Sequence, residues 1–276
     1  MAEMTGLDAA GLLADAIAAR SGGEEPPLIG LNGAQGSGKS TMAQEAERQL
    51  AARGLRLAVL SLDDFYLTRA ERRELARCIH PLCATRGVPG THDAALMRRT
   101  IDALSGAEPD EVTRLPAFDK LADDRLPRDE WHRFRGRPDA VLLEGWCVGL
   151  LSDDLPPWQG PINALEREFD VDGRWAVWSH AALERDYDDM WRSLTMLASI
   201  EVPGLDTVIS SRLRQEQELA AKTGRTGMDR EAVTRFVQHY ERHTRALWSA
   251  MPRRADLLLR RDADYRYTLV KGEMNE

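Results

Sequence analysis

A nine-residue segment near the N-terminus constrains this chain more than any other feature. Residues 33–41 match the pattern G-x-x-x-x-G-K-[ST]. Glycines in such a segment let consecutive backbone N–H groups turn toward phosphate oxygens, a conformation that side chains would block. Lys39 is expected to reach the β- and γ-phosphates of a nucleotide, and the Ser40 hydroxyl to bind the Mg²⁺ that bridges them. The residues predicted to form this phosphate-binding loop, or P-loop, are Gly33, Ala34, Gln35, Gly36, Ser37, Gly38, Lys39, Ser40 and Thr41.

The sequence around the P-loop supplies the strand and the helix that this motif requires. Residues 28–31 have the pattern of a short buried strand, and residues 40–53 carry apolar side chains at helical spacing as far as Gly54. Further buried strands are predicted at residues 57–62, 140–143, 194–202 and 255–259. Their alternation with helices predicts an α/β fold of the P-loop NTPase type. In such a fold a mostly parallel sheet has helices on both faces and ligands at the carboxyl ends of its strands.

The chain is interpreted as a single domain, residues 1–276, with three specialised regions. Residues 1–25 are the N-terminal helix and lead-in. Residues 66–138 have little strand pattern but many Pro, Gly, Arg and Asp residues, which indicates an insertion that builds an acceptor pocket. Residues 204–249 are interpreted as a helical lid. The lid is expected to comprise helices over residues 204–221 and 229–249, joined by a polar segment at 222–227.

Composition narrows the class of partner. A hydrophobic fraction of 43% and a charged fraction of 30% are ordinary for a soluble globular protein. No apolar run reaches the length of a membrane span, and no export signal is visible, so the cytoplasm is the expected location. A net charge of −8 argues against nonspecific nucleic-acid binding, which needs a basic face. We therefore expect a small-molecule partner, with no nucleic acid and no membrane.

Acidic residues stand at the ends of two predicted strands beside the P-loop. Asp63 follows the strand at residues 57–62, where it can accept the proton of an attacking hydroxyl or hold the metal ion through water. The structural alternative for Asp63 is that it caps a turn. For the adjacent Asp64, a functional role and turn capping are equally open. Glu144 ends the strand at residues 140–143, the expected position of a carboxylate that serves Mg²⁺.

Arginines offer contacts to an acceptor and to a transferring phosphoryl group. In the turn at residues 86–93, Arg86 and His92 suit an anionic, hydroxylated acceptor, because guanidinium pairs bidentately with carboxylate. The alternative is an arginine–aspartate salt bridge that ties down the loop. Arg212 can neutralise charge in the transition state, with Arg225 as a second candidate, or it can pair with Glu216 one helical turn further on.

Taken together, the separated motifs resemble those of the D-glycerate 3-kinase family. The resemblance spans about residues 28–260 and rests on residues 33–41, 62–68, 86–93, 143–146 and 212–216, with 227–228 downstream. That family is related to uridine kinase, phosphoribulokinase and bacterial pantothenate kinase. The resemblance implies a P-loop kinase that uses ATP and Mg²⁺ to phosphorylate a small hydroxylated metabolite. The leading acceptor implied by the resemblance is D-glycerate, and its phosphorylation would give 3-phosphoglycerate.

The resemblance also implies roles for individual residues. Lys39, Asp63 and Arg212 would be catalytic, with Asp63 as the base, and Ser40, Glu144 and Asp63 would serve the metal ion. The residues expected to contact the acceptor are Tyr66, Arg86, His92, Asp93, Asp119 and Lys120. This chain departs from the family pattern in a short segment between Lys120 and Arg125 and in residues 150–192. Another acceptor, such as a nucleoside, pantothenate or a sugar-like molecule, therefore stays open, as does an ATP-dependent switch or assembly factor.

Overall fold

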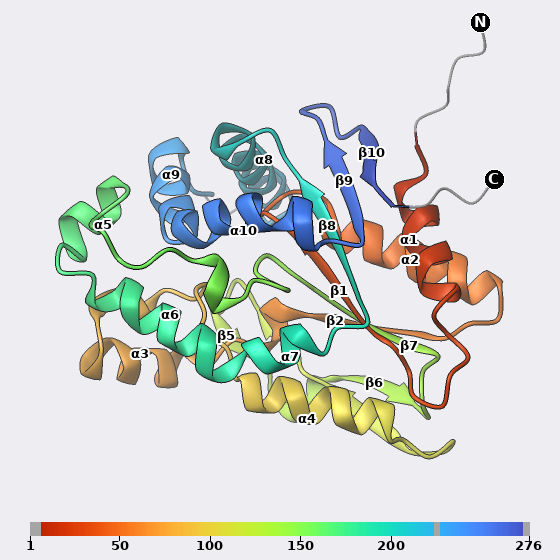
Figure 1. Cartoon of the computed structure of the whole chain (residues 1–276). Helices are drawn as coiled ribbons and strands as arrows, with labels where there is room; N and C mark the ends of the chain where they lie inside the picture. The colour runs from red at the N-terminus through yellow and green to blue at the C-terminus, as the bar shows by residue number, and fades with distance from the viewer. Residues whose placement is uncertain (1–6, 224–226, 273–276) are drawn as a thin grey trace, which may run out of the picture.

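The computed structural model of the protein describes residues 7–223 and 227–272, and a six-stranded sheet forms its centre (Figure 1). The strand order is β10-β9-β8-β1-β7-β2. The parallel strands are β1 (Leu28–Gly33), β2 (Leu57–Ser61), β7 (Ala140–Gly145), β8 (Met196–Glu201) and β9 (Leu257–Arg261). β10 (Tyr267–Lys271) pairs antiparallel with β9. The predicted α/β fold with a mostly parallel sheet is confirmed.

Alternate residues of each central strand pack against helices on opposite faces of the sheet. In β7, Leu142 packs toward α1 (Ala9–Ala18) and α2 (Lys39–Ala52). Its neighbour Leu143 belongs to the cluster on the other face. The helices of that face include α4 (Ala94–Ser105), α6 (Arg174–Asp186), α7 (Asp188–Arg192) and α10 (Glu241–Arg254). Figure 1 shows the two helical layers, with α1 and α2 on the side opposite to α4, α6 and α7.

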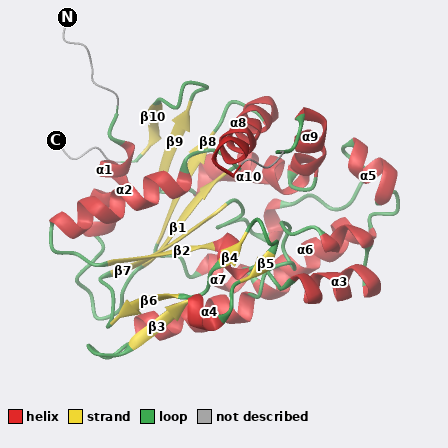
Figure 2. Ribbon diagram, turned by 180° about the vertical axis from the view of Figure 1, so that it is seen from behind, coloured by secondary structure: helices red, strands yellow, loops and turns green. Residues whose placement is uncertain are grey.

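The region predicted as an insertion, residues 66–138, contains helices and two small strand pairs. Its elements are α3 (Arg69–Cys78), α4, the pair β3 (Val112–Leu115) and β6 (His132–Arg135), and the pair β4 (Phe118–Asp119) and β5 (Asp124–Arg125). The β3–β6 pair lies apart from the main sheet (Figure 2). Strands of two to four residues are too short to show an alternating pattern, so the sequence predicted little strand here.

The first helix predicted for the lid, at residues 204–221, corresponds to helix α8 (Leu205–Thr223). The single helix predicted over residues 229–249 is wrong, because the chain forms α9 (Arg230–Gln238) and then α10. Asp229 caps α9 by accepting a hydrogen bond from the N–H of Ala232 at 2.8 Å. Apolar residues continue at helical spacing across the break, which hides it in the sequence. Residues 224–226 of the polar segment at 222–227, including Arg225, lie outside the described residues.

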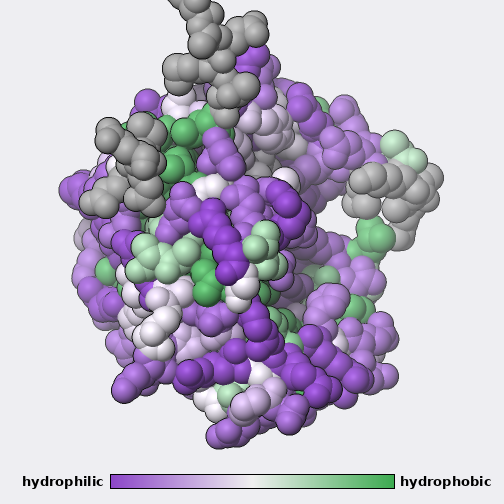
Figure 3. All heavy atoms as spheres, turned by 90° about the vertical axis from the view of Figure 1, so that its right-hand side faces the viewer, coloured by the Kyte–Doolittle hydropathy of each residue, from purple (hydrophilic) through white to green (hydrophobic). Residues whose placement is uncertain are grey.

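The surface is mostly hydrophilic on the side that carries α1 and α2, where hydrophobic side chains appear only in small groups (Figure 3). The short helix α5 (Ala164–Phe169) completes the set of α-helices in the described ranges. Within residues 7–223 and 227–272, no helix combines the length and the apolar character needed to cross a membrane.

Candidate active site

The P-loop joins β1 to α2 in the predicted order, and two of its glycines adopt left-handed backbone conformations. Gly36 has a φ of 71° and Gly38 a φ of 95°, which glycine accepts at no steric cost. A Cβ atom at Gly36 would lie 2.6 Å from Cβ of Ser211 in α8. One at Gly38 would collide with the hydroxyl of Tyr267 in β10. The loop is therefore packed closely against α8 and the C-terminal strand.

Side chains from β9 and β10 also hold the P-loop in place through hydrogen bonds. Arg261 is 1% exposed and donates hydrogen bonds to the carbonyl of Gly36 at 2.8 Å and to Oγ of Ser211 at 3.1 Å. The hydroxyl of Tyr267 donates to the carbonyl of Ser37 at 3.2 Å. The sequence analysis missed both residues. The available signal was an arginine in alternation with buried leucines of β9, which places it on their face of the strand.

Oxygen atoms from three segments meet beside the P-loop. The hydroxyls of Ser40 and Ser61 donate to Oε1 of Glu144 at 2.8 and 3.0 Å. Such a set of hydroxyl and carboxylate oxygens suits Mg²⁺, which takes its remaining ligands from phosphates and water. Among the described residues, no group of three or more His, Cys, Asp or Glu side chains could hold a metal ion. The oxygens present fit part of the ligand set of a Mg²⁺ ion.

Asp63 and Lys120 form an ion pair across the middle of the site. Nζ of Lys120 lies 2.7 Å from Oδ2 of Asp63, which belongs to the short 3₁₀ helix η1 (Leu62–Phe65) after β2. Burial alone would raise the pKa of Asp63, but the charges of Lys120 and Lys39 lower it to about 2. Asp63 also raises the pKa of Lys120. Both groups are therefore charged at neutral pH.

Lys39 lies beside this pair, with Nζ donating to the carbonyl of Ala34 at 3.1 Å. Burial lowers the pKa of Lys39, and the carboxylates of Glu144 and Asp63 oppose that shift. An ammonium group that is partly stripped of water and close to the P-loop backbone can exchange its carbonyl contact for a phosphate oxygen.

Asp64 has a different environment from Asp63. Its Oδ1 atom accepts a hydrogen bond from the N–H of Phe118 at 3.0 Å, which anchors β4. Burial raises the pKa of Asp64 to about 6, and the negative charge of Asp63 adds to the effect. Asp64 lines a second hollow, of about 590 Å³, which Ser40, Asp63, Lys120 and Glu144 also line. Asp63 alone of the two aspartates also lines the cleft that contains Lys39 and the P-loop glycine Gly36.

A cleft of about 660 Å³, open to solvent, lies at the carboxyl edge of the sheet. The predicted site residues that line it are Gln35, Gly36, Lys39, Ser40, Asp63, Tyr66, Arg86, Lys120, Glu144 and Arg212. It is also lined by Trp146, Gln215, Phe236 and Tyr240, which the sequence analysis did not assign to a site. Aromatic residues at helical spacing usually belong to a core, so the sequence held no signal for the last two.

One predicted acceptor contact, His92, lies behind the cleft wall. The ring of His92 stacks on that of Tyr66, with 4.5 Å between the ring centroids. Its Nδ1 atom lies 2.9 Å from the hydroxyl of Tyr187. His92 is 5% exposed, and burial lowers its pKa to about 3, so the ring is neutral. The structure thus places His92 as a support for Tyr66, which does line the cleft.

Asp93 and Asp119 also lie outside the residues that line the cleft. Asp93 caps α4 by accepting from the N–H of Leu96 at 2.9 Å, and it pairs with Arg125 at 3.3 Å. Oδ1 of Asp119 accepts hydrogen bonds from the backbone N–H groups of residues 121 and 122, which closes the β4–β5 turn. Both carboxylates therefore shape the segments that carry cleft residues.

Arg86 lines the cleft while one of its nitrogens pairs with Asp123. Asp123 has a φ of 54°, and its carboxylate is also held by Arg72 at 3.0 Å. The guanidinium of Arg86 lies 5.4 Å from the ring centroid of Phe118. The alternative of a loop-tying salt bridge is therefore present, with Asp123 as the partner of Arg86. It fixes Arg86 at the edge of the cleft.

Arg212 similarly combines both arrangements considered for it. It lines the cleft from α8 and pairs with Glu216 one helical turn further on. Its guanidinium lies 5.1 Å from the ring centroid of Phe236 in α9. Glu216 also accepts from the N–H of Met228 at 3.1 Å, so the pair joins α8 to the segment before α9.

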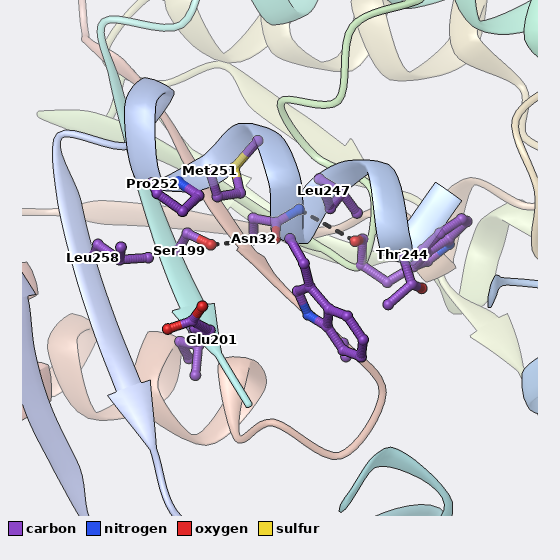
Figure 4. A pocket seen from close by; sticks show the side chains of 12 residues that line it. Asn32, Ser199, Glu201, Thr244, Leu247, Met251, Pro252 and Leu258 are labelled. Atoms are coloured by element: carbon purple, nitrogen blue, oxygen red, sulfur yellow. Dashed lines mark hydrogen bonds between the residues drawn. The ribbon is translucent and has the colours of Figure 1, made fainter. Parts of the chain in front are cut away.

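A buried amide connects the strands behind the cleft. Nδ2 of Asn32, at the end of β1, donates to the carbonyls of Trp146 at 3.2 Å and Val148 at 2.9 Å. Ser199 of β8 donates to Oδ1 of Asn32 at 3.4 Å. Figure 4 shows the Asn32 side chain between Ser199 and the chain that follows β7. This network holds Trp146, two residues after Glu144, in place beside the cleft.

A parallel sheet with a P-loop at its carboxyl edge, facing a polar cleft, defines the class of P-loop nucleotide-binding proteins, which includes small-molecule kinases. The chain is 32% identical over 223 residues to the uncharacterized kinase mug58 of Schizosaccharomyces pombe. The matched region covers 78% of this chain and 78% of mug58. It is 28% identical over 229 residues to the chloroplastic D-glycerate 3-kinase of Arabidopsis thaliana, covering 80% of this chain and 48% of the plant protein. No protein-family model matches the chain.

The fold agrees with a solved structure of the same class. The D-glycerate 3-kinase from Cryptococcus neoformans superposes with a TM-score of 0.72 at 26% sequence identity, over 94% of this chain and 97% of that one. The chain belongs to the D-glycerate 3-kinase family of ATP-dependent P-loop kinases. The family resemblance of the sequence motifs is thereby confirmed.

Proposed function

We propose that this protein transfers the γ-phosphoryl group of ATP to a hydroxyl of D-glycerate, giving 3-phosphoglycerate. The observation that carries the proposal is the cleft in which the P-loop, the Asp63 carboxylate and the cations Arg86 and Lys120 come together. Phosphoryl transfer depends on positioning and on neutralising charge. An acceptor with a carboxylate and adjacent hydroxyls would match the cations and the base at once. The names of two relatives support the same acceptor.

In this proposal each residue acts on one part of the reaction. Lys39 binds the γ-phosphate, Asp63 accepts the proton of the acceptor hydroxyl, and Arg212 neutralises charge on the transferring group. Ser40 and Glu144 would hold Mg²⁺, which when bound neutralises charge on the β- and γ-phosphates. Residues 66–138 would form the acceptor-binding part of the domain, and residues 204–249 the lid that excludes water.

The nucleoside of ATP would occupy a separate hollow of about 470 Å³ between α8 and the β9–β10 turn. This hollow adjoins the P-loop, because Ser211, one of its lining residues, packs against Gly36. Arg214 and Tyr265 line it, with 5.4 Å between the guanidinium and the ring centroid. A planar cation beside an aromatic ring suits the stacking of a flat base.

Arg214→Ala should raise the KM for ATP by about 3- to 10-fold, the range expected for one cation–π contact. The KM for the acceptor should stay the same, because Arg214 does not line the cleft. Steady-state ADP release with each substrate varied in turn measures both constants. Arg253→Ala, at an exposed position of α10, serves as the control. A rise in the acceptor KM alone would contradict the placement of the nucleoside.

Arg86→Ala should raise the KM for an anionic acceptor by about 10- to 100-fold, as expected for one hydrogen-bonded charge contact. The KM for ATP should change little. Asp123 keeps Arg72 as a partner in this variant, so the turn should stay folded. Kinetics with D-glycerate and ATP, together with the melting temperature, measure the effect. An unchanged acceptor KM would remove Arg86 from the acceptor pocket.

The proposed acceptor is tested by ADP release with Mg-ATP and a panel of acceptors: D-glycerate, L-glycerate, uridine, pantothenate, ribulose 5-phosphate and glycerol. Strong stimulation by D-glycerate alone, with NMR of the product as 3-phosphoglycerate, is the expected result. Stimulation by another member would keep the kinase and replace the acceptor. ADP release that none of these acceptors stimulates, with intact ATP binding, would overturn the assignment of the pocket.

A further inference from the structure

The ion pair between Lys120 and Asp63 occupies a position that the reaction needs. A general base must have an oxygen within about 2.6–3.2 Å of the hydroxyl whose proton it accepts. Oδ2 of Asp63 already accepts a hydrogen bond from Nζ of Lys120 at 2.7 Å. The ammonium group therefore stands where the acceptor hydroxyl would have to approach that oxygen.

The two arginines that line the cleft have partners that take no part in the proposed chemistry. Arg86 pairs with Asp123, which Arg72 also holds, and Arg212 pairs with Glu216 in its own helix. These pairs can persist throughout a reaction cycle. Lys120 differs from them because its partner is the proposed base itself.

Lys120 can leave Asp63 without any movement of the backbone. It stands in the turn between β4 and β5, and its side chain is 56% exposed. The hairpin is fixed on both sides of the turn, by the contact between Asp64 and Phe118 and by Arg125, which donates to the carbonyl of Tyr66 at 2.8 Å. Rotation of the lysine side chain alone would free the carboxylate. A partly exposed ion pair contributes little to stability, so its exchange for another anion costs little.

We propose that Lys120 is a specificity-determining residue that makes the availability of Asp63 depend on the charge of the acceptor. A carboxylate on the acceptor, bound between Arg86 and Lys120, draws the ammonium group away from Oδ2. The acceptor hydroxyl then takes that place, its proton passes to Asp63, and its oxygen bonds to the γ-phosphorus as the bond to ADP breaks. Water and neutral polyols carry no negative charge to attract Lys120, so in their presence its ion pair with Asp63 stays intact. The inference rests on the proposed function in one respect, the anionic acceptor.

The test compares Lys120→Met, which keeps the aliphatic stem and removes the charge, with Lys120→Arg, which keeps the charge. Lys271→Met, at an exposed position of β10, is the matched control. The first readout is ADP release from Mg-ATP without any acceptor. In Lys120→Met it should rise at least about tenfold, the scale of one charge-assisted hydrogen bond, because water gains access to Asp63. Adding Asp63→Asn to Lys120→Met should abolish the rise.

The second readout is the ratio of kcat/KM for D-glycerate to that for glycerol, its neutral analogue. Lys120→Met should lower this ratio by about 10- to 100-fold, since the anionic acceptor loses a contact and the neutral one loses an obstacle. Lys271→Met should stay within about threefold of the wild type, and Lys120→Arg, which keeps the charge, should recover most of the ratio that Lys120→Met loses. An equal loss on both acceptors with unchanged acceptor-free ADP release would overturn the proposal.

The two proposals fail in different ways. If the wild-type protein ignores D-glycerate, the acceptor assignment fails, whereas the acceptor-free ADP release of Lys120→Met still decides whether Lys120 blocks Asp63. If D-glycerate is phosphorylated and Lys120→Met changes neither readout, the role of Lys120 is wrong and the acceptor assignment stands. Melting temperatures of all variants show whether any loss reflects unfolding.

Discussion

Lys39→Ala should lower kcat by about 10³-fold, the upper end of the range for losing one preorganised donor to a developing charge. The ammonium group of Lys39 lies within the P-loop, and burial lowers its pKa, so it is already partly desolvated before a phosphate arrives. A cation in that state loses little hydration when it binds the γ-phosphate. Its removal should therefore lower the rate of phosphoryl transfer much more than it lowers the stability of the fold.

The measurement for Lys39→Ala combines single-turnover kinetics with ATP binding by calorimetry and a melting temperature. Binding should weaken, and the melting temperature should change little, because Lys39 contacts only the carbonyl of Ala34 among the hydrogen bonds described for it. Lys271→Ala is a control for the loss of a lysine elsewhere on the surface. Turnover near the wild-type rate would mean that phosphate is held by another group, and Arg212 would be the first to examine.

The sequence predicted the central sheet well because buried parallel strands are nearly continuous apolar runs. β1, β7 and β8 are of this kind, and each falls within or beside a predicted segment. β10 escaped prediction because it is an edge strand with mostly exposed or half-buried side chains. Local pattern also hid the break between α9 and α10, since the apolar face continues across it.

The candidate site was predictable wherever it follows from one motif or from the end of a strand. Ser40 and Glu144 meet because parallel strands present their carboxyl ends at one edge of the sheet. Pairings between distant side chains could not be predicted in the same way. Arg86 and Asp123 are 37 residues apart, Lys120 and Asp63 are 57 apart, and Arg261 and Gly36 are 225 apart. Such contacts depend on how loops pack, which leaves no periodic signal in the sequence.

The predicted roles of His92, Asp93 and Asp119 illustrate the same limit. Each stands in a segment that does reach the cleft, but side-chain direction decides which residue of a segment faces a ligand. In these segments the residues that line the cleft are Tyr66, Arg86 and Lys120. The three predicted residues instead stack, cap or close a turn around them. A turn-forming aspartate satisfies backbone N–H groups first, and this use competes with ligand binding.

Asp63→Asn should lower kcat by about 10²- to 10⁴-fold, the contribution expected of a general base. The KM for ATP should stay close to that of the wild type. Asparagine has the size of aspartate and can still accept a hydrogen bond from Lys120 through its side-chain oxygen, so the β4–β5 turn should keep its position. The carboxylate of Asp63 is ionised at neutral pH because Lys120 and Lys39 outweigh the effect of burial on its pKa. The variant therefore removes a negative charge and a proton acceptor, and little else.

Asp64→Asn is the comparison that makes this result specific. Its amide oxygen can still accept from the N–H of Phe118, so β4 should remain anchored, while the negative charge next to Asp63 is removed. If Asp63 is the base, Asp64→Asn should change kcat by less than about tenfold. If instead Asp63→Asn turns over normally and Asp64→Asn does not, the base is Asp64. Its pKa of about 6 would then place the loss of activity on acidification near pH 6.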